Sequence, residues 1–94
     1  MNLLILGDIM GVSGRKALSN KLPKLIKNNN IDFVIVNGEN ASDDGRGITQ
    51  EISKDFFKLG VDVITSGNHI WDKKEIADFI EKENRLLRPA NLAS

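Results

Sequence analysis

Three short apolar runs recur along the chain, and each one ends in a glycine that is followed by polar residues. The glycines Gly7, Gly38 and Gly67 are 31 and 29 residues apart. This interval is about the length of one strand, crossover helix and strand, roughly 30 residues. The pattern therefore predicts an α/β fold with parallel β-α-β-α-β-α layers, and right-handed crossovers would bring the three polar clusters to one edge of the sheet.

The predicted strands cover about residues 2–7, 33–36 and 61–66. The first is a continuous apolar run, which is typical of a parallel strand covered on both faces, so we expect helices on both sides of the sheet. From Arg85 onward the pattern becomes irregular, and the sequence ends where a fourth strand would be expected.

Three helices are expected between and after these strands. Ser13 can cap the first near Gly14, Pro23 should kink or split it, and residues 28–30 should end it. Thr49 should cap the second helix, Gly60 should end it, and Asp72 should cap the third. Their buried stripes are predicted to be Leu18, Leu22, Leu25 and Ile26, then Ile52, Phe56 and Leu59, then Ile76, Phe79 and Ile80.

Composition excludes several classes of partner and site. The 94 residues hold 13 basic and 13 acidic side chains, spread along the chain, which argues against long nucleic acid or a membrane surface as a partner. There is no cysteine, so any metal must be held by oxygen and nitrogen. The amino terminus has no basic leader, so we expect a cytoplasmic protein. A sheet of three strands has little interior, and residues 1–94 are therefore expected to be the truncated amino-terminal portion of one domain.

The first glycine-rich turn does not match either common phosphate-binding motif. Position 9 is isoleucine, so the dinucleotide pattern lacks its middle glycine, and Gly14 is not followed by the Lys-Ser or Lys-Thr of a P-loop.

The polar clusters suit a divalent metal site better. Asp8 and Glu39 would face each other at neighbouring strand ends, where two carboxylates repel unless a cation or a proton lies between them. Glu39 could bridge two ions, which lie about 3.5 to 4 Å apart in two-metal hydrolases. Asn40 and Asn68 would add neutral amide oxygens, and His69 is then either a ligand or a proton donor.

Four motifs follow one another along essentially the whole chain: Gly7-Asp8-Ile9-Met10-Gly11, Asn37-Gly38-Glu39-Asn40-Ala41, Gly67-Asn68-His69-Ile70-Trp71-Asp72 and Leu87-Arg88-Pro89-Ala90-Asn91. In this order they resemble the amino-terminal part of the YmdB-like branch of the calcineurin-like metallophosphoesterases. Many metallophosphoesterases have histidine two positions after the first aspartate, whereas this chain has Met10, which fits the YmdB-like branch because that branch lacks the histidine.

The resemblance implies the amino-terminal part of a metallophosphoesterase α/β sandwich that hydrolyses cyclic nucleotide phosphodiesters with two divalent metal ions. Iron is the expected metal, and manganese, zinc and magnesium are the alternatives. It implies Asp8 on one ion, Glu39 bridging, Asn68 on the other ion, Asn40 beside the metals, and His69 as general acid or charge stabiliser at the phosphate. It also implies a small phosphodiester substrate and a homo-oligomer.

Two other classes of function stay open. One is a non-catalytic nucleotide- or phosphate-binding module without metal, and the other is an assembly fragment whose uncovered strand edge pairs with another chain. The chain has a single histidine, whereas the family completes its site with histidines from its carboxyl-terminal part, so we expect the isolated chain to be weakly active or inactive. Trp71 is expected to pack at a helix entry, with stacking on a base as the alternative. Arg15, Arg46 and Arg88 are expected to be solvated, with a contact to phosphate as the alternative for each.

Overall fold

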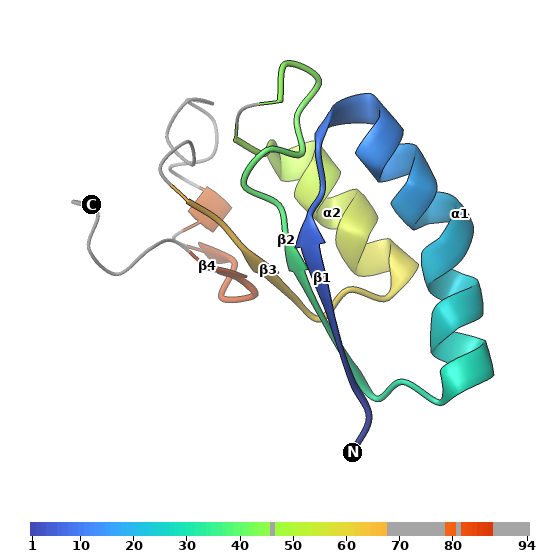
Figure 1. The fold of residues 1–94 in the computed structure, drawn as a ribbon. Coiled ribbons are helices and arrows are strands. Elements are labelled where there is room, and N and C mark those ends of the chain that lie inside the picture. Colours follow the sequence, from blue (N-terminus) through green and yellow to red (C-terminus); the bar gives the residue numbers. More distant parts are fainter. Residues whose placement is uncertain (46, 68–78, 81, 88–94) are drawn as a thin grey trace.

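The structure is a computed structural model that describes residues 1–45, 47–67, 79–80 and 82–87. Its elements, in chain order, are β1 (Leu3–Asp8), α1 (Gly11–Asn29), β2 (Phe33–Asn37), α2 (Gln50–Leu59), β3 (Val63–Thr65) and β4 (Leu86–Leu87). The strands form one sheet in the order β1-β2-β3-β4, and every neighbouring pair is parallel (Figure 1). The predicted α/β fold is confirmed.

The fourth strand is a correction to the sequence analysis, which placed irregular chain from Arg85 onward. Leu86 and Leu87 pair with Ile64 and Thr65 of β3. The guanidinium of Arg85 lies 4.0 Å from the centre of the Phe57 ring on α2, which anchors the turn before β4. A strand of two residues is too short to show any alternation, so the sequence pattern could not reveal it.

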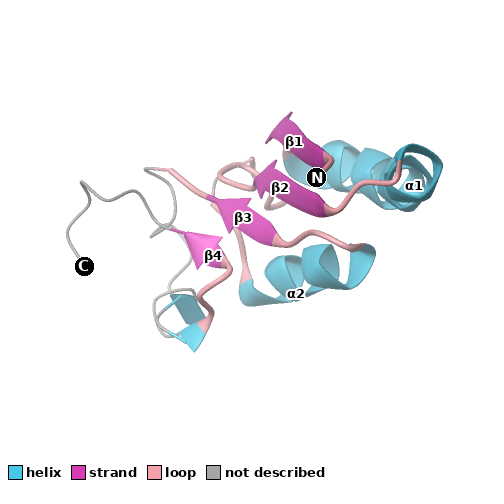
Figure 2. Cartoon of the chain, turned by 90° about the horizontal axis from the view of Figure 1, so that it is seen from below, coloured by secondary structure: helices cyan, strands magenta, loops and turns pink. Residues whose placement is uncertain are grey.

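Helices α1 and α2 lie on the same face of the sheet (Figures 1 and 2). This follows from the strand order, because successive right-handed crossovers to adjacent positions all return on one side. The prediction that both faces of β1 are covered is therefore wrong: Leu3 is 50% exposed and Ile5 is 66% exposed. The apolar run of β1 has one face against the helices and one face open.

The start of α1 also differs from the prediction. The helix begins at Gly11, its N-cap is Met10, and no side chain caps it, so Ser13 is not the cap. The backbone N–H of Gly11 donates instead to the carbonyl of Asn40, 3.0 Å away, which ties the helix start to the loop after β2. Pro23 lies inside α1 without dividing it, and the helix ends at Asn29, before Asn30 in the left-handed conformation.

Helix α2 has the predicted caps. The hydroxyl of Thr49 accepts a hydrogen bond from the N–H of Ile52 at 3.1 Å, and Gly60 ends the helix with φ 111°. The helices pack over a core whose largest fully buried apolar side chains are Phe56, Leu22, Ile48, Ile64, Val34 and Val36. Phe79 and Ile80 are buried as predicted, whereas Asp72 and Ile76 lie outside the described residues.

Close packing continues to the end of β2. A Cβ at Gly38 would lie 2.8 Å from Ile64 Cγ2 and 3.0 Å from Ile48 Cδ1, so only glycine fits there without displacing the core. The loop that follows β2 is thus seated directly on the core. In the part of the chain that the structure describes, no helix combines the length and apolar character needed to cross a membrane.

Candidate functional site

Asp8 stands at the carboxyl end of β1, where the pairing with β2 is irregular. Leu6 pairs with Val36, but the next pair is Asp8 with Asn37, so Gly7 is an extra residue in β1. Such a bulge changes the face on which the following side chain lies. Leu6 and Val36 belong to the face that packs against the helices, whereas Asn37 lies one position further along β2. The bulge therefore brings Asp8 to the sheet edge beside Asn37, and its side chain is exposed.

The loop after β2 carries Glu39 and Asn40, and backbone contacts fix it on both sides. The side-chain oxygen of Asn37 accepts from the N–H of Glu39 at 2.9 Å, which forms a tight local turn. The carbonyl of Glu39 accepts from the N–H of Gly47 at 2.6 Å, and the carbonyl of Asn40 accepts from Gly11 at the start of α1. The backbone that presents these two side chains is thus held by β2, by its own loop and by α1.

Asn40 and Asp8 are in direct contact. The amide nitrogen of Asn40 lies 3.1 Å from one carboxylate oxygen of Asp8 and 3.3 Å from the other. The two residues are 32 positions apart in the chain, and the parallel pairing of β1 with β2 brings them together. In this arrangement the NH2 group of Asn40 donates to the Asp8 carboxylate and orients it. This contact is additional to the predicted position of Asn40 beside a metal.

Glu39 points toward the end of β3. A Cβ built on Gly67 would overlap Oε2 and the carboxyl carbon of Glu39 and would lie 2.9 Å from Oε1. The carboxylate therefore fills the space that a side chain at position 67 would need. Gly67 directly precedes Asn68, so Glu39 reaches the strand end from which the third predicted cluster begins.

These residues fit a divalent cation in part. Their donors are carboxylate and amide oxygens, which suit hard and borderline divalent ions, and Glu39 reaches across the strand ends as a bridging carboxylate must. Within the described residues, however, no group of three or more His, Cys, Asp or Glu side chains is arranged to hold a metal ion. Asn68 and His69 lie outside the described residues, so their predicted roles stay predictions, as do those of Asp8, Glu39 and Asn40.

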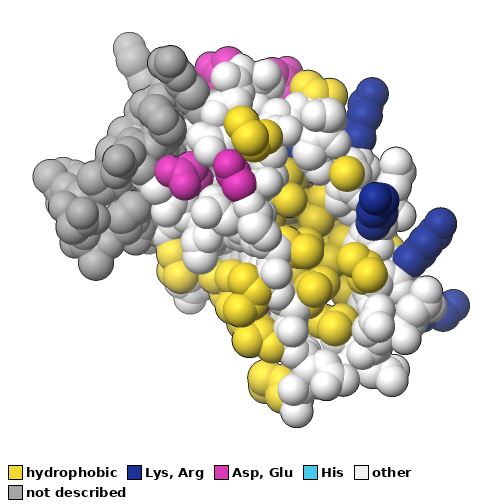
Figure 3. Space-filling model, viewed as in Figure 1, with side chains coloured by type: hydrophobic (Ala, Val, Ile, Leu, Met, Phe, Trp, Pro, Cys, Tyr) yellow, Lys and Arg dark blue, Asp and Glu magenta, His cyan; other side chains and the backbone are white. Residues whose placement is uncertain are grey.

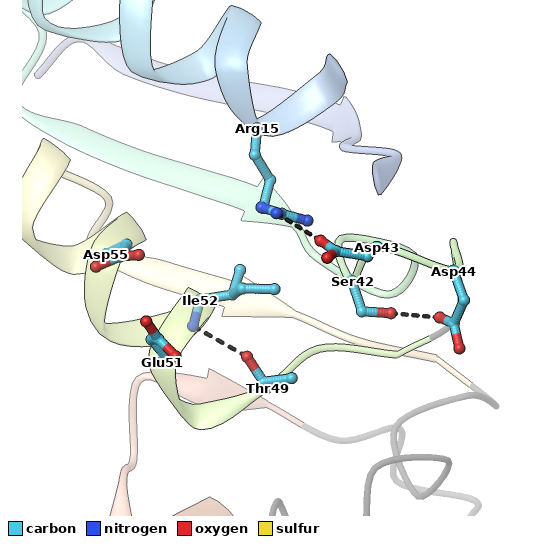
Figure 4. Close-up of a pocket in the computed structure, with 8 residues that line it drawn as sticks. All are labelled: Arg15, Ser42, Asp43, Asp44, Thr49, Glu51, Ile52 and Asp55. Carbon is cyan, nitrogen blue, oxygen red and sulfur yellow. Dashed lines mark hydrogen bonds and ion pairs between the residues drawn. The ribbon is translucent and has the colours of Figure 1, made fainter. Parts of the chain in front are cut away.

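A separate pocket of about 530 Å³ lies between the loop after β2 and the start of α2 (Figure 4). Neither Asp8, Glu39 nor Asn40 lines it, so it is distinct from the candidate metal site. Its lining residues are Arg15, Ser42, Asp43, Asp44, Thr49, Glu51, Ile52 and Asp55. This pocket is too acidic to suit a phosphate ester.

An apolar groove of about 300 Å³ runs beside the candidate site, between β1 and α1. Figure 3 shows hydrophobic side chains gathered over this part of the surface. Asp8 lies at one end of the groove, whose other lining residues are Leu6, Ile9, Gly14, Ala17, Leu18, Lys21, Leu22 and Leu25. The candidate ligands are thus bordered by apolar surface on the side of β1.

Comparison with known proteins decides the family. A family model described as "YmdB-like protein" matches residues 4–94. The chain belongs to the YmdB-like family. The resemblance inferred from the four motifs is therefore confirmed, and the strand ends described above carry the first two of those motifs.

Named relatives of this YmdB-like chain include enzymes. It is 46% identical over 91 residues to a Bacillus subtilis protein named 2',3'-cyclic-nucleotide 2'-phosphodiesterase, and the match covers 97% of this chain and 34% of that protein. It is 34% identical to a Mycoplasma genitalium protein named putative phosphatase/phosphodiesterase, over 98% of this chain and 32% of that protein. The chain thus spans about a third of the length of the curated relatives that it matches.

Solved structures agree with the YmdB-like fold. A crystal structure described as a novel phosphatase from Mycoplasma pneumoniae superposes with a TM-score of 0.88 at 35% identity, over 97% of this chain and 32% of that one. A hypothetical protein from Thermus thermophilus superposes with a TM-score of 0.87 at 36% identity, over 99% of this chain and 35% of that one.

Sequence reasoning missed two features of the site. It treated Arg15 as a solvated surface residue, whereas Arg15 bonds the loop that carries Glu39 and Asn40. It quoted Gly67 as part of a motif without a reason for the glycine, which the position of the Glu39 carboxylate now supplies. No sequence pattern signals either contact, because each joins residues from different elements.

Proposed function

We propose that this chain belongs to a metal-dependent phosphodiesterase that hydrolyses cyclic nucleotide phosphodiesters at a dinuclear metal site. The observation that carries the proposal is the contact of two predicted ligands, Asp8 and Asn40, at the carboxyl ends of β1 and β2, with the carboxylate of the adjacent Glu39 reaching the end of β3. The names of the relatives, phosphodiesterase and phosphatase, support a phosphoester substrate.

In this proposal the site would hold two divalent ions, with iron favoured over manganese, zinc and magnesium. When bound, the ions would stabilise negative charge on the phosphate oxygens and would supply a nucleophile at neutral pH. Asp8 and Glu39 hold them, with Asn68 as a further ligand. Asn40 keeps the Asp8 carboxylate oriented, and His69 donates a proton to the ribose oxygen that leaves phosphorus. The polar sheet edge would bind the phosphate diester, and the apolar groove beside β1 borders it on one side.

The decisive experiment uses the whole protein with Asp8→Asn and Glu39→Gln variants. Each change keeps the size of the side chain and removes its charge, so metal content and hydrolysis of a 2',3'-cyclic nucleotide should both fall, on the order of 100-fold or more in rate. Matched controls are Asp55→Asn and Glu51→Gln, two exposed carboxylates of α2 that should change neither quantity. Chelation should abolish turnover in the unchanged protein, and adding the metal back should restore it.

The same experiment separates the alternative functions. Nucleotide binding that survives chelation, in a protein that does not hydrolyse the nucleotide even when metal is supplied, would contradict the proposal and favour a phosphate-binding module. Unchanged activity in Asp8→Asn would also contradict it. The predicted homo-oligomer and the cytoplasmic location stay predictions, and light scattering on the purified whole protein would test the first.

A further inference from the structure

Arg15 joins the first turns of α1 to the loop that carries the candidate ligands. Its Nη1 donates to the carbonyl of Ala41 at 2.6 Å, and its Nη2 donates to a carboxylate oxygen of Asp43 at 2.7 Å. Figure 4 shows the side chain extending from α1 to Asp43 in this loop. The expectation that Arg15 is solvated is therefore wrong, and only 25% of its side chain is exposed.

The two contacts of Arg15 differ in weight. The Asp43 side chain is 78% exposed, and an ion pair in such a position contributes little because water and salt screen it. Ala41 is completely buried with Arg15 in place, and removing a charged donor from a buried carbonyl costs more than breaking an exposed ion pair. The bond to Ala41 is therefore the stronger of the two contacts that Arg15 makes with the loop, and it adds to the backbone hydrogen bonds that hold the loop.

The position of Ala41 links this bond to the candidate site. Ala41 directly follows Asn40, whose side chain contacts Asp8 and whose carbonyl accepts from the N–H of Gly11. Gly11 and Arg15 both belong to the start of α1, and Ile9 and Met10 are the only residues between Asp8 and this helix. The start of α1 thus holds the loop at two successive residues, next to the strand that carries the first candidate ligand.

We infer that Arg15 is a positioning residue for the metal site. By bonding the Ala41 carbonyl, it helps to fix the loop that sets Asn40 against Asp8 and directs the Glu39 carboxylate toward the end of β3. It touches neither metal nor substrate and acts through the loop backbone alone. This inference rests on the proposed function.

The test compares Arg15→Ala, Arg15→Lys and Asp43→Asn in the whole protein, with Lys16→Ala as a control at the adjacent, exposed helix position. Three quantities are measured: hydrogen exchange of the backbone amides of residues 38–47, metal affinity by calorimetry, and the thermal unfolding midpoint. Loss of a residue that orients metal ligands lowers metal affinity by about 10- to 100-fold, and we expect this for Arg15→Ala.

The other variants locate the effect. Arg15→Lys keeps the charge but loses the planar fork, so it should show an intermediate loss of affinity and faster exchange in the loop. Asp43→Asn and Lys16→Ala should match the unchanged protein in all three measurements. If Arg15→Ala does not fold, Arg15→Lys and Asp43→Asn decide the question between them.

Two results would overturn the inference. Metal affinity and loop exchange in Arg15→Lys and Arg15→Ala could equal those of the unchanged protein, or Asp43→Asn could lose as much affinity as Arg15→Ala, which would place the effect in the ion pair. An unchanged protein that binds no metal would overturn the proposed function as well, and calorimetry on that protein reveals this before any variant is compared.

Discussion

At position 67 the space beyond Cα is filled by the carboxylate of Glu39, so a side chain there would displace the flexible end of Glu39. The backbone of Glu39 is held by Asn37 and Gly47, and its side chain alone can move. Gly67→Ala should therefore turn the carboxylate out of its place with little effect on the fold. We expect metal affinity to fall by about tenfold or more, as measured by calorimetry.

Gly7, at the end of β1, provides a control for the substitution at Gly67. Among the described residues, no heavy atom beyond the neighbours of Gly7 comes within 4 Å of a Cβ built there. Gly7→Ala should consequently leave metal affinity near that of the unchanged protein, and circular dichroism should show both variants folded. Equal affinities in the two variants would mean that the Glu39 carboxylate does not bind metal from the position seen here.

At the scale of one element, alanine substitutions at Thr49 and Ser13 should have different effects on the stability of the protein. The Thr49 hydroxyl accepts from the N–H of Ile52, so Thr49→Ala should lower the free energy of unfolding by about 1 kcal/mol. Ser13 lies exposed within α1 and caps no helix, so Ser13→Ala should change the free energy of unfolding by less than about 0.5 kcal/mol. Urea unfolding measures both, and Thr49→Ser should restore stability. A larger loss in Ser13→Ala would contradict the observed start of α1.

The ends of the two helices also show which features a sequence can predict. Thr49 and Gly60 cap α2 by bonding backbone groups within a few residues of themselves, so their residue types and spacing are sufficient to predict both ends of this helix. The start of α1 is set instead by the carbonyl of Asn40, which is distant in the chain, and the local signal at Ser13 was misleading. The one-sided cover of the sheet likewise depends on strand order, which the apolar run of β1 does not encode.

For the candidate site, the sequence predicts which residues are ligands, and the structure shows the contacts that hold Asp8, Glu39 and Asn40. The contact of Asp8 with Asn40 follows from two parallel strands ending at one edge, which the spacing of glycines predicts. The bulge at Gly7 and the bonds of Arg15 depend on three-dimensional packing between elements. Such contacts leave no periodic trace in a sequence, so they could not have been predicted from it.

At the scale of the whole molecule, the open face of the sheet affects how the chain behaves by itself. Leu3 and Ile5 are exposed on this face, and β1 stands at the edge of the sheet in the described part of the structure. Exposed apolar strands at an edge promote association between chains. Measurements on the isolated 94-residue chain therefore need dilute samples, with light scattering to record its oligomeric state.

The last prediction concerns the number of ligands that this chain offers. Its candidate ligands are Asp8, Glu39, Asn40 and Asn68, its one histidine, His69, is the candidate proton donor, and it has no cysteine. Two transition-metal ions need about four or more ligands each, so even a bridging Glu39 leaves both ions short of protein donors. The isolated chain should therefore bind metal more weakly than the whole protein, by about tenfold at the least, because removing even an outer-shell partner has that effect.

Calorimetry and turnover of a 2',3'-cyclic nucleotide on both proteins test this directly, with circular dichroism to establish that the isolated chain is folded. We expect turnover by the isolated chain to be close to the uncatalysed rate, because ions with too few ligands are neither retained nor held at the spacing that phosphate transfer requires. If the folded chain instead matched the whole protein in metal-dependent turnover, the five residues would be a complete site, and the ligand count used here would be wrong.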